Sequence, residues 1–174
     1  MLVIAKNVGK VFEQNFKNSC PNDVLVHRPP DAAQSFDMSS KLRFSQHSPC
    51  DFMIFSGKRN TFWTLELKSF EGSCSFERKK GEKGIIHYYQ IESLKKFSLY
   101  KNVCSGLILD FRKSGNTYFL KIDEWDNLIN SVIKKSFNEE DLLKYSNPIL
   151  IEKKKLKINY RYDIEKFLND TKLN

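Results

Sequence analysis

The stretch that decides the fold of this chain runs Cys50-Asp-Phe-Met-Ile-Phe55, then Ser56-Gly-Lys-Arg-Asn60, then Thr61-Phe-Trp-Thr-Leu-Glu-Leu-Lys68. Both outer segments are rich in Phe, Ile, Trp, Thr and Leu, whereas the segment between them is polar and contains a glycine. That pattern is typical of two antiparallel strands joined by a short turn. We therefore expect a β-hairpin here.

The second strand of this hairpin should have two different faces. Because side chains alternate along a strand, Glu66 and Lys68 are expected on one face of the sheet. The opposite face would carry the apolar side chains of the same strand, namely Trp63, Leu65 and Leu67. A charged pair would thus lie on a mostly apolar framework.

The turn brings a second carboxylate to the charged face. A hairpin centred near Lys58 places Asp51 opposite residues 65–67 and next to Glu66, since cross-strand neighbours lie about 5 Å apart. Burying two carboxylates is costly unless a cation or Lys68 compensates their charge. Oxygen ligands without Cys or His suit Mg²⁺ or Mn²⁺ better than zinc. A site for Mg²⁺, or for Mn²⁺ in its place, at Asp51 and Glu66 is one interpretation of this pattern, and an edge hairpin with solvated charges is the other.

The composition favours one folded, basic domain. A chain of 174 residues is long enough for a sizeable core, and we expect a single domain over residues 1–174. Hydrophobic residues make up 40% and aromatic residues 13%, which argues for a globule and against disorder. The chain has 29 Lys and Arg against 21 Asp and Glu, a net charge of +8. Basic globules most often meet nucleic acid or another polyanion.

The cysteines and the N-terminus predict an intracellular, cytoplasmic protein. The four cysteines form no C-x-x-C pair and are expected to be reduced thiols: Cys20, Cys50, Cys74 and Cys104. The opening apolar run at residues 1–5 is too short for a secretory signal. No run approaches the ~18 apolar residues of a membrane span.

Upstream of the hairpin, we expect a helix from a cap at Asn7 to about Asn18. Its apolar stripe consists of Val8, Val11, Phe12 and Phe16. Glu13 lies beside that stripe, with Gly9 one turn earlier on the same side, where backbone or DNA could approach closely. The alternative interpretation of Glu13 is a solvated helix glutamate.

A long polar segment separates the next strand, at about 24–28, from the hairpin. Residues 31–47 lack periodicity and exceed the connections that compact hairpins use, so they should form a functional excursion, unless they are an ordinary mobile loop. Arg28 at the foot of the excursion and Lys41 and Arg43 within it could contact DNA phosphates.

Downstream of the hairpin, residues 69–84 combine glycines and serines with a basic cluster of Arg78, Lys79 and Lys80. They are expected to form a mobile loop that contacts phosphates beside the acidic site, although a solvated charge run fits them equally well. A helix from residue 85 to about 99 should follow, with Gln90 near its start and on its apolar side.

The remaining pattern predicts two further strands and two helices. Strands at 105–111 and 117–122 should flank a hairpin turn at 112–116. A helix from about residue 123 should bury Leu128, Ile129, Val132 and Ile133. A last short helix is expected at 164–168. The lysine run at 153–155 is better interpreted as solvated charge than as a DNA contact.

Three short motifs resemble a nuclease superfamily. Ser48-Pro-Cys-Asp51 followed by Glu66-Leu-Lys68 resembles the PD-(D/E)XK signature, in which an acid precedes an acid-X-Lys on the next strand. The proline stands one residue further from Asp51 than in that signature. Gly9-Lys-Val-Phe-Glu13 resembles the first-helix pattern of the Holliday-junction class, and His87-Tyr-Tyr-Gln90 resembles its H-x-x-Q helix start.

The order of elements from about Val8 to Ile129 is similar to that of RecU-type Holliday-junction resolvases, including phage-encoded relatives. The resemblance implies an α/β fold, a central mixed β-sheet flanked by helices as in restriction endonucleases, with residues 31–47 as a projecting stalk. It also implies a homodimer, because a four-way junction has two-fold symmetry and needs two matched nicks. The implied substrate is branched DNA, and no membrane is involved.

The implied activity is that of a Mg²⁺-dependent endodeoxyribonuclease. Asp51 and Glu66, helped by Glu13, would hold the metal, which lowers the pKa of its bound water. Lys68 would orient or deprotonate that water, or stabilise developing charge. Gln90 would position the lysine or the water.

Two other interpretations remain open. The chain could be another PD-(D/E)XK nuclease, of the restriction or repair type. It could also be a non-catalytic DNA-binding or recombination module that kept the fold, although such a module has no need of the full set of polar site residues.

Overall fold

The computed structural model describes residues 7–30 and 48–173, so the excursion at 31–47 lies outside the described residues. Six strands form one sheet in the order β1-β2-β3-β5-β6-β8. Their bounds are Leu25–His27, Phe52–Ser56, Thr61–Phe70, Val103–Phe111, Asn116–Lys121 and Ile149–Leu150. β3 and β5 run parallel and the other neighbours antiparallel, so the sheet is mixed.

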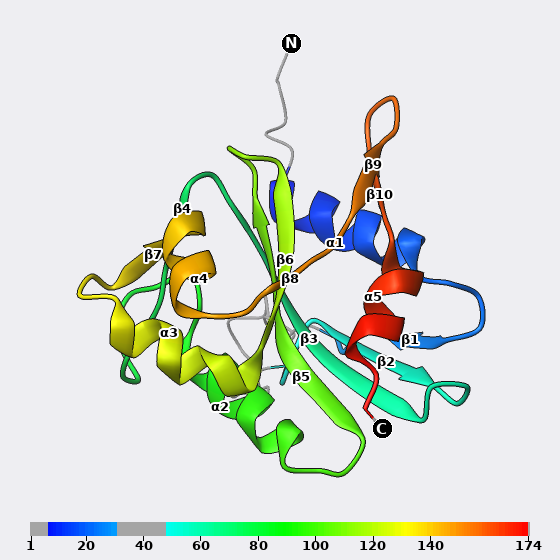
Figure 1. The fold of residues 1–174 in the computed structure, drawn as a ribbon, viewed down its shortest axis with the longest axis horizontal. Coiled ribbons are helices and arrows are strands. Elements are labelled where there is room, and N and C mark those ends of the chain that lie inside the picture. Colours follow the sequence, from blue (N-terminus) through cyan, green and yellow to red (C-terminus); the bar gives the residue numbers. More distant parts are fainter. Residues whose placement is uncertain (1–6, 31–47, 174) are drawn as a thin grey trace, which may run out of the picture.

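Helices cover both faces of this sheet (Figure 1). On one side lie α1 (Val8–Ser19), α5 (Ile164–Thr171) and the hairpin of β9 (Lys153–Lys155) and β10 (Tyr160–Tyr162). On the other lie α2 (Tyr88–Ser98), the 3₁₀ turn η1 (Ile122–Glu124), α3 (Trp125–Ser131) and α4 (Glu139–Tyr145). Each face buries its own apolar cluster against the sheet. The prediction of an α/β fold with a central mixed sheet is confirmed.

The central hairpin has the predicted register. Phe52 pairs with Leu65 and Ser56 with Thr61. Continued by one residue, this register places Asp51 opposite Glu66. The apolar residues of β3 pack against the α1 and α5 side, as the alternation predicts: Trp63, Leu65 and Leu67. A one-residue slip would turn every side chain of β3 to the other face. The hydrophobic pattern therefore selects this register.

The two helices on the α1 side begin and end for identifiable reasons. Asn7 caps α1 by accepting a hydrogen bond from the Lys10 amide at 3.3 Å, as predicted. The predicted stripe is buried at Phe12 and Phe16, whereas Val8 is 43% exposed. The last helix continues three residues beyond the predicted end, because Thr171 accepts a buried hydrogen bond from the Trp63 indole at 2.9 Å.

The segment 69–84 is not the mobile loop that its composition suggested. It contains β4 (Ser73–Ser75), which pairs with β7 (Ser136–Asn138), and a fully buried Phe76. A bridge between Phe76 and Ile86 keeps Ile86 extended, so α2 begins at Tyr88 and not at residue 85. Long-range packing here overrides the local signal of glycine, serine and charge.

The expected helix from about residue 123 is shorter than predicted. The 3₁₀ turn comes first, and α3 ends at Ser131. Leu128 is buried within the helix and Val132 just after it, as expected, but Ile133 is fully exposed. The prediction that Ile133 is buried was wrong because the helix ends at Ser131 and Val132 is extended, so Ile133 does not continue the apolar face of the helix.

The described residues also bear on the expectations about thiols and membranes. All four cysteines are free of disulfide bonds, as predicted. Over residues 7–30 and 48–173, none of the helices combines the length and the apolar character that crossing a bilayer requires.

The core around Gly106 of β5 is packed so closely that a substitution there tests the fold. A Cβ built on Gly106 would lie 2.4 Å from the Leu120 carbonyl oxygen and 2.4 Å from the Phe119 ring. We expect Gly106→Ala to destabilise the fold by about 1–3 kcal/mol, the usual cost of overpacking a core. Thermal unfolding of purified protein measures this loss.

Gly9→Ala is the matched control for that substitution. Its Cβ would meet nothing closer than Asn7 at 3.5 Å, and Gly9 lies inside α1. Alanine is favoured over glycine in a helix by up to about 1 kcal/mol, so this variant should unfold at a higher temperature. Equal melting temperatures for the two variants would contradict the described packing.

Candidate active site

Asp51 is held against β3 by two backbone contacts. Its own N–H donates to the Leu65 carbonyl at 3.1 Å, which continues the ladder between β2 and β3. Its Oδ2 accepts a hydrogen bond from the Leu67 amide at 2.7 Å. These contacts orient the carboxylate beside Glu66, as the hairpin register predicted.

Glu66 is the most enclosed member of the site. The residue is 2% exposed, and its Oε1 receives Lys68 Nζ at 2.9 Å. Gln90 of α2 donates its side-chain N–H to the same oxygen. The structure thus brings Asp51, Glu66, Lys68 and Gln90 together from three separate segments of the chain, as predicted.

Ionising both carboxyl groups of the site is costly, even with Lys68 beside them. Burial, followed by repulsion from Glu66, raises the pKa of Asp51 to about 7. Burial also raises the pKa of Glu66, although Lys68 opposes the shift. Burial alone would lower the pKa of Lys68, but its contact with Glu66 outweighs that effect and the pKa is raised. The lysine therefore stays an ammonium in contact with Glu66.

The chemistry of this donor set fits a hard divalent cation. Two carboxyl groups supply oxygen ligands, and one ammonium leaves room for further positive charge. The neighbouring Cys50 is a poor ligand, because burial, Glu66 and Asp51 raise the pKa of its thiol to about 12. Mg²⁺ or Mn²⁺ therefore suits the site better than zinc does.

Gln90 is placed by the start of its helix. The His87 N–H donates to Gln90 Oε1 at 2.9 Å, which leaves the amide nitrogen directed at Glu66. Glu77 accepts hydrogen bonds from the Tyr88 amide at 2.9 Å and contacts His87 Nδ1 at 2.8 Å. Glu77 was not predicted as a functional residue, yet it ties the first turn of α2 to the β4 segment.

Glu13 lies near the site without joining it directly. It forms an ion pair with Arg28 at 2.7 Å, and its charge contributes to the raised pKa of Glu66. Both residues border a cavity of about 290 Å³ together with Lys10, Gln14, Lys17 and Phe52. Within residues 7–30 and 48–173, no three His, Cys, Asp or Glu side chains converge to hold a metal. A metal role for Glu13 stays a prediction.

The predicted DNA-contacting cations have different surroundings. The Arg78 guanidinium donates to the carbonyls of Val132 at 2.8 Å and Lys134 at 3.3 Å, and it lies over the Phe76 ring. Arg78 thus braces the segment after β4, whereas Lys79 and Lys80 are exposed. Lys41 and Arg43, which were also predicted to contact DNA, lie outside the described residues.

Tyr89 is a border residue to which the sequence pattern assigned no function. The residue is 37% exposed, and its ring stacks on His87 with centroids 5.6 Å apart. Burial, followed by the charge of Glu66, raises the pKa of its hydroxyl, and the charge of Lys68 opposes that shift. The signal that could have found it is its position directly before Gln90.

This chain is similar to a few known proteins, although no family model matches it. The SPbeta prophage-derived uncharacterized protein YotM of Bacillus subtilis (strain 168) is 29% identical over 180 residues, which cover 95% of this chain and 87% of that protein. A solved structure of Archaeoglobus fulgidus Hjc, a Holliday junction resolvase from an archaeal hyperthermophile, matches with a TM-score of 0.42 and 14% identity. That match covers 74% of this chain and 83% of the Hjc chain.

The cost of ionising Asp51 in the folded protein predicts a gain in stability when its carboxyl group is replaced by an amide. We expect Asp51→Asn to melt a few degrees higher than the parent in metal-free buffer. The amide removes a charge beside Glu66 but can still accept the Leu67 hydrogen bond. Adding Mg²⁺ should raise the melting temperature of the parent and have little effect on the variant.

The exposed carboxylate Asp170, near the end of α5, offers a matched control. Asp170→Asn makes the same chemical change outside the site, so it should keep the Mg²⁺ response of the parent. A full Mg²⁺ response in Asp51→Asn would show that Asp51 does not hold the cation.

Proposed function

We propose that this protein is a metal-dependent, structure-selective DNA endonuclease. The preferred substrate is a four-way (Holliday) junction, which a homodimer resolves by paired symmetric nicks. The observation that carries the proposal is the site itself: Asp51 and Glu66 meet on adjacent strands, with Lys68 bound to Glu66. This arrangement matches the acid followed by E-x-K that the sequence pattern predicted.

The residues of this site suit hydrolysis of a phosphodiester. Mg²⁺, when bound, supplies a Lewis acid and a water of lowered pKa. Asp51 and Glu66 are the residues that would hold it. Lys68 contacts Glu66 and is the more exposed of the two, so its ammonium can orient the attacking water or stabilise negative charge on phosphate. Gln90 restrains Glu66 through their hydrogen bond.

The wider charge distribution supports a nucleic-acid substrate. The two carboxylates of the site repel phosphate, so affinity for DNA has to come from cations elsewhere on the chain. The net charge of +8 supplies them, and Lys79 and Lys80 are exposed on the segment between β4 and α2. Arg28 instead neutralises Glu13, so its predicted DNA contact requires that ion pair to be shared or broken.

The preference for junctions rests on symmetry and on the order of elements. A four-way junction has two-fold symmetry. A C2 dimer therefore presents two equal active sites to two symmetry-related DNA strands of the junction. The order of helix, strand, long excursion and acidic hairpin is the pattern that resembles the RecU-type resolvases. In this proposal the excursion at 31–47 supplies Lys41 and Arg43 near the junction centre.

Cleavage of defined DNA tests the catalytic assignment. With Mg²⁺, the parent should cut a labelled mobile four-way junction by paired symmetric nicks and cut the matched linear duplex far more slowly. Asp51→Asn, Glu66→Gln and Lys68→Ala should each abolish cleavage, while junction binding in EDTA stays within a few-fold. The carboxylates are assigned to metal, so their loss should spare DNA affinity.

The outcomes of that assay separate the competing functions. Asp170→Asn should cleave like the parent, since that carboxylate lies outside the site. Equal cleavage of duplex and junction would indicate a nuclease of the restriction or repair type. Junction binding without any cleavage would indicate the non-catalytic module, and parental rates in Asp51→Asn would refute the site assignment.

Gln90 is assigned as a positioning residue, with a distinct expected signature. Gln90→Ala removes the hydrogen bond to Glu66, so the carboxylate is less well oriented for metal. We expect the Mg²⁺ concentration for half-maximal cleavage to rise about 10–100-fold, as for other residues that orient metal ligands. Higher Mg²⁺ should restore most of the rate.

Ser93→Ala provides a control on the same helix. The Ser93 hydroxyl is bound to the Tyr89 carbonyl at 2.8 Å and does not contact Glu66. This variant should keep the Mg²⁺ dependence of the parent. If Gln90→Ala lowers the rate equally at all Mg²⁺ concentrations, Gln90 acts on the reaction by another route.

A further inference from the structure

A β-hairpin with an exposed basic tip extends from the body of the protein beside α1 (Figure 1). Its strands are β9 and β10, and the loop 156–159 joins them. We call residues 154–161 of this hairpin the basic arm. Every residue of the arm is exposed, whereas the chain on either side of it returns to the core.

The foot of the arm is held by a buried ion pair. Lys153 Nζ contacts Asp110 Oδ1 at 2.8 Å and donates to Thr117 Oγ1 at 2.8 Å. The same ammonium lies 4.9 Å from the Tyr160 ring centroid and 5.5 Å from that of Tyr162. Lys153 is therefore fully engaged in structure, and its role differs from that of the lysines that follow it.

The other strand of the foot is attached to α1. The Tyr162 N–H donates to Ser19 Oγ at 3.0 Å, and its ring packs edge-on against Phe12 with centroids 5.7 Å apart. At the far end, the Leu156 N–H donates to the Asn159 carbonyl at 2.8 Å and closes the loop. The arm is thus a defined ribbon anchored at one end.

The basic arm concentrates positive charge without ion pairs among the described residues. Four cations lie on it, and the segment 154–161 contains no acid: Lys154, Lys155, Lys157 and Arg161. In the part of the chain that the structure describes, none of the four forms an ion pair, although other surface lysines do. Lys154 is paired directly across the ribbon with Arg161. Like charges directly opposite each other destabilise a strand pair.

Such an arrangement is unfavourable in the free protein and favourable against a polyanion. We propose that the basic arm binds the sugar–phosphate backbone of DNA, as a two-stranded ribbon laid along or into a groove of one duplex arm of the substrate. The major groove of B-DNA is about 12 Å wide and admits a two-stranded β-ribbon. This inference rests on the proposed function for its ligand, but it assigns a contact surface remote in sequence from the acidic site.

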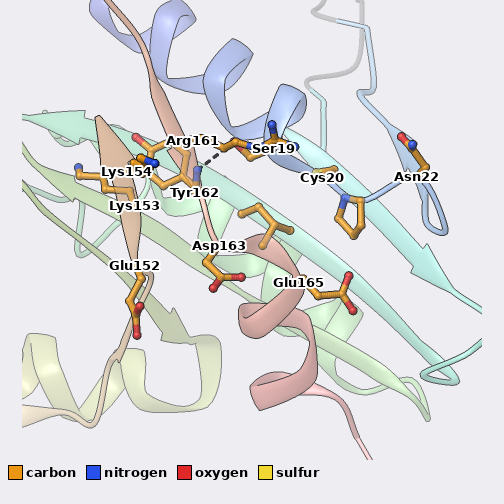
Figure 2. A pocket seen from close by; sticks show the side chains of 12 residues that line it. Ser19, Cys20, Asn22, Glu152, Lys153, Lys154, Arg161, Tyr162, Asp163 and Glu165 are labelled. Atoms are coloured by element: carbon orange, nitrogen blue, oxygen red, sulfur yellow. Dashed lines mark hydrogen bonds between the residues drawn. The ribbon is translucent and has the colours of Figure 1, made fainter. Parts of the chain in front are cut away.

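A cavity at the foot of the basic arm indicates along which side of the arm the DNA phosphates would run. A cavity of about 520 Å³ lies there, between the end of α1, the arm and the start of α5. Figure 2 shows Lys154 and Arg161 at one side of this cavity, while Asp163 and Glu165 occupy another part of its lining. These carboxylates repel phosphate, so the backbone should run along the outer arm and not through the cavity.

The tip of the arm carries apolar groups that suit the same ligand. Leu156 is 48% exposed and Ile158 is 77% exposed, at positions between the cations. Apolar side chains at the tip of a ribbon can contact sugar or base surfaces within a groove, while the flanking cations contact phosphates. The proposal therefore accounts for both the charged and the apolar exposed residues of the arm.

Charge neutralisation with a matched control tests this proposal. The arm variant replaces its four cations by Gln, at Lys154, Lys155, Lys157 and Arg161. The control variant replaces four exposed lysines elsewhere by Gln, at Lys58, Lys96, Lys101 and Lys172. Both variants lower the net charge of +8 by four, so long-range electrostatics are equal. Binding to a labelled junction and to duplex is measured in EDTA over roughly 50–200 mM salt.

We expect the arm variant to lose at least tenfold in affinity for both DNAs at low salt. Its plot of log affinity against log salt should become shallower by about 0.9 for each phosphate that the arm no longer neutralises. The control variant should change far less. Because the arm cations repel one another, the arm variant should melt at the same temperature as the parent or above it. Equal DNA binding by the two variants overturns the proposal.

The same measurements distinguish this inference from the proposed nuclease activity. A parent protein that binds DNA through the arm but cuts neither substrate with Mg²⁺ refutes the nuclease and supports the arm. A parent that binds no DNA overturns the arm proposal outright. If cleavage is retained while arm neutralisation leaves both affinity and salt dependence unchanged, the nuclease stands and the arm does not bind DNA.

Discussion

The pairing of β2 with β3 is the constraint on which the candidate site depends. It sets Phe52 against Leu65, and the hydrogen bond from the Leu67 amide then orients Asp51 beside Glu66. A slip of one residue would place Glu66 in the apolar cluster of α1 and α5. The hydrophobic packing of β3 therefore also determines which carboxylates meet.

Two regions of the molecule place groups of like charge close together. At the acidic site, Asp51 and Glu66 share one ammonium, and burial raises the pKa of both carboxyl groups. On the basic arm, Lys154 and Arg161 face each other without an acid. Each arrangement opposes folding slightly and favours a ligand of opposite charge. The acidic site suits a cation and the arm suits a polyanion, which is the combination that a metal-dependent nuclease requires.

The buried pair of Lys153 and Asp110 shows the contrasting case. Asp110 also accepts hydrogen bonds from Ser69 at 2.9 Å and Thr117 at 2.8 Å, and two tyrosine rings enclose the ammonium. The polar groups of this cluster have partners and its charges balance, so its role as an anchor for the arm accounts for it fully. A charge cluster becomes a candidate for binding where, as at Asp51 and Glu66, burial makes the ionised state of its groups costly.

The sequence alone determined the central hairpin and most of the acidic site, because alternation and turn position are local properties: Asp51, Glu66 and Lys68 follow from a period of two. Gln90 was predicted from the resemblance of its segment to an H-x-x-Q helix start, because helical position alone fits a boundary residue equally well. The tertiary structure decided what depends on distant contacts. Arg78 stabilises the segment after β4 because its guanidinium donates to the carbonyls of residues 132 and 134. Lys153, although part of the lysine run, pairs with Asp110. Local pattern assigns a lysine or arginine to the surface by default, and only the folded chain shows which of them has a buried partner.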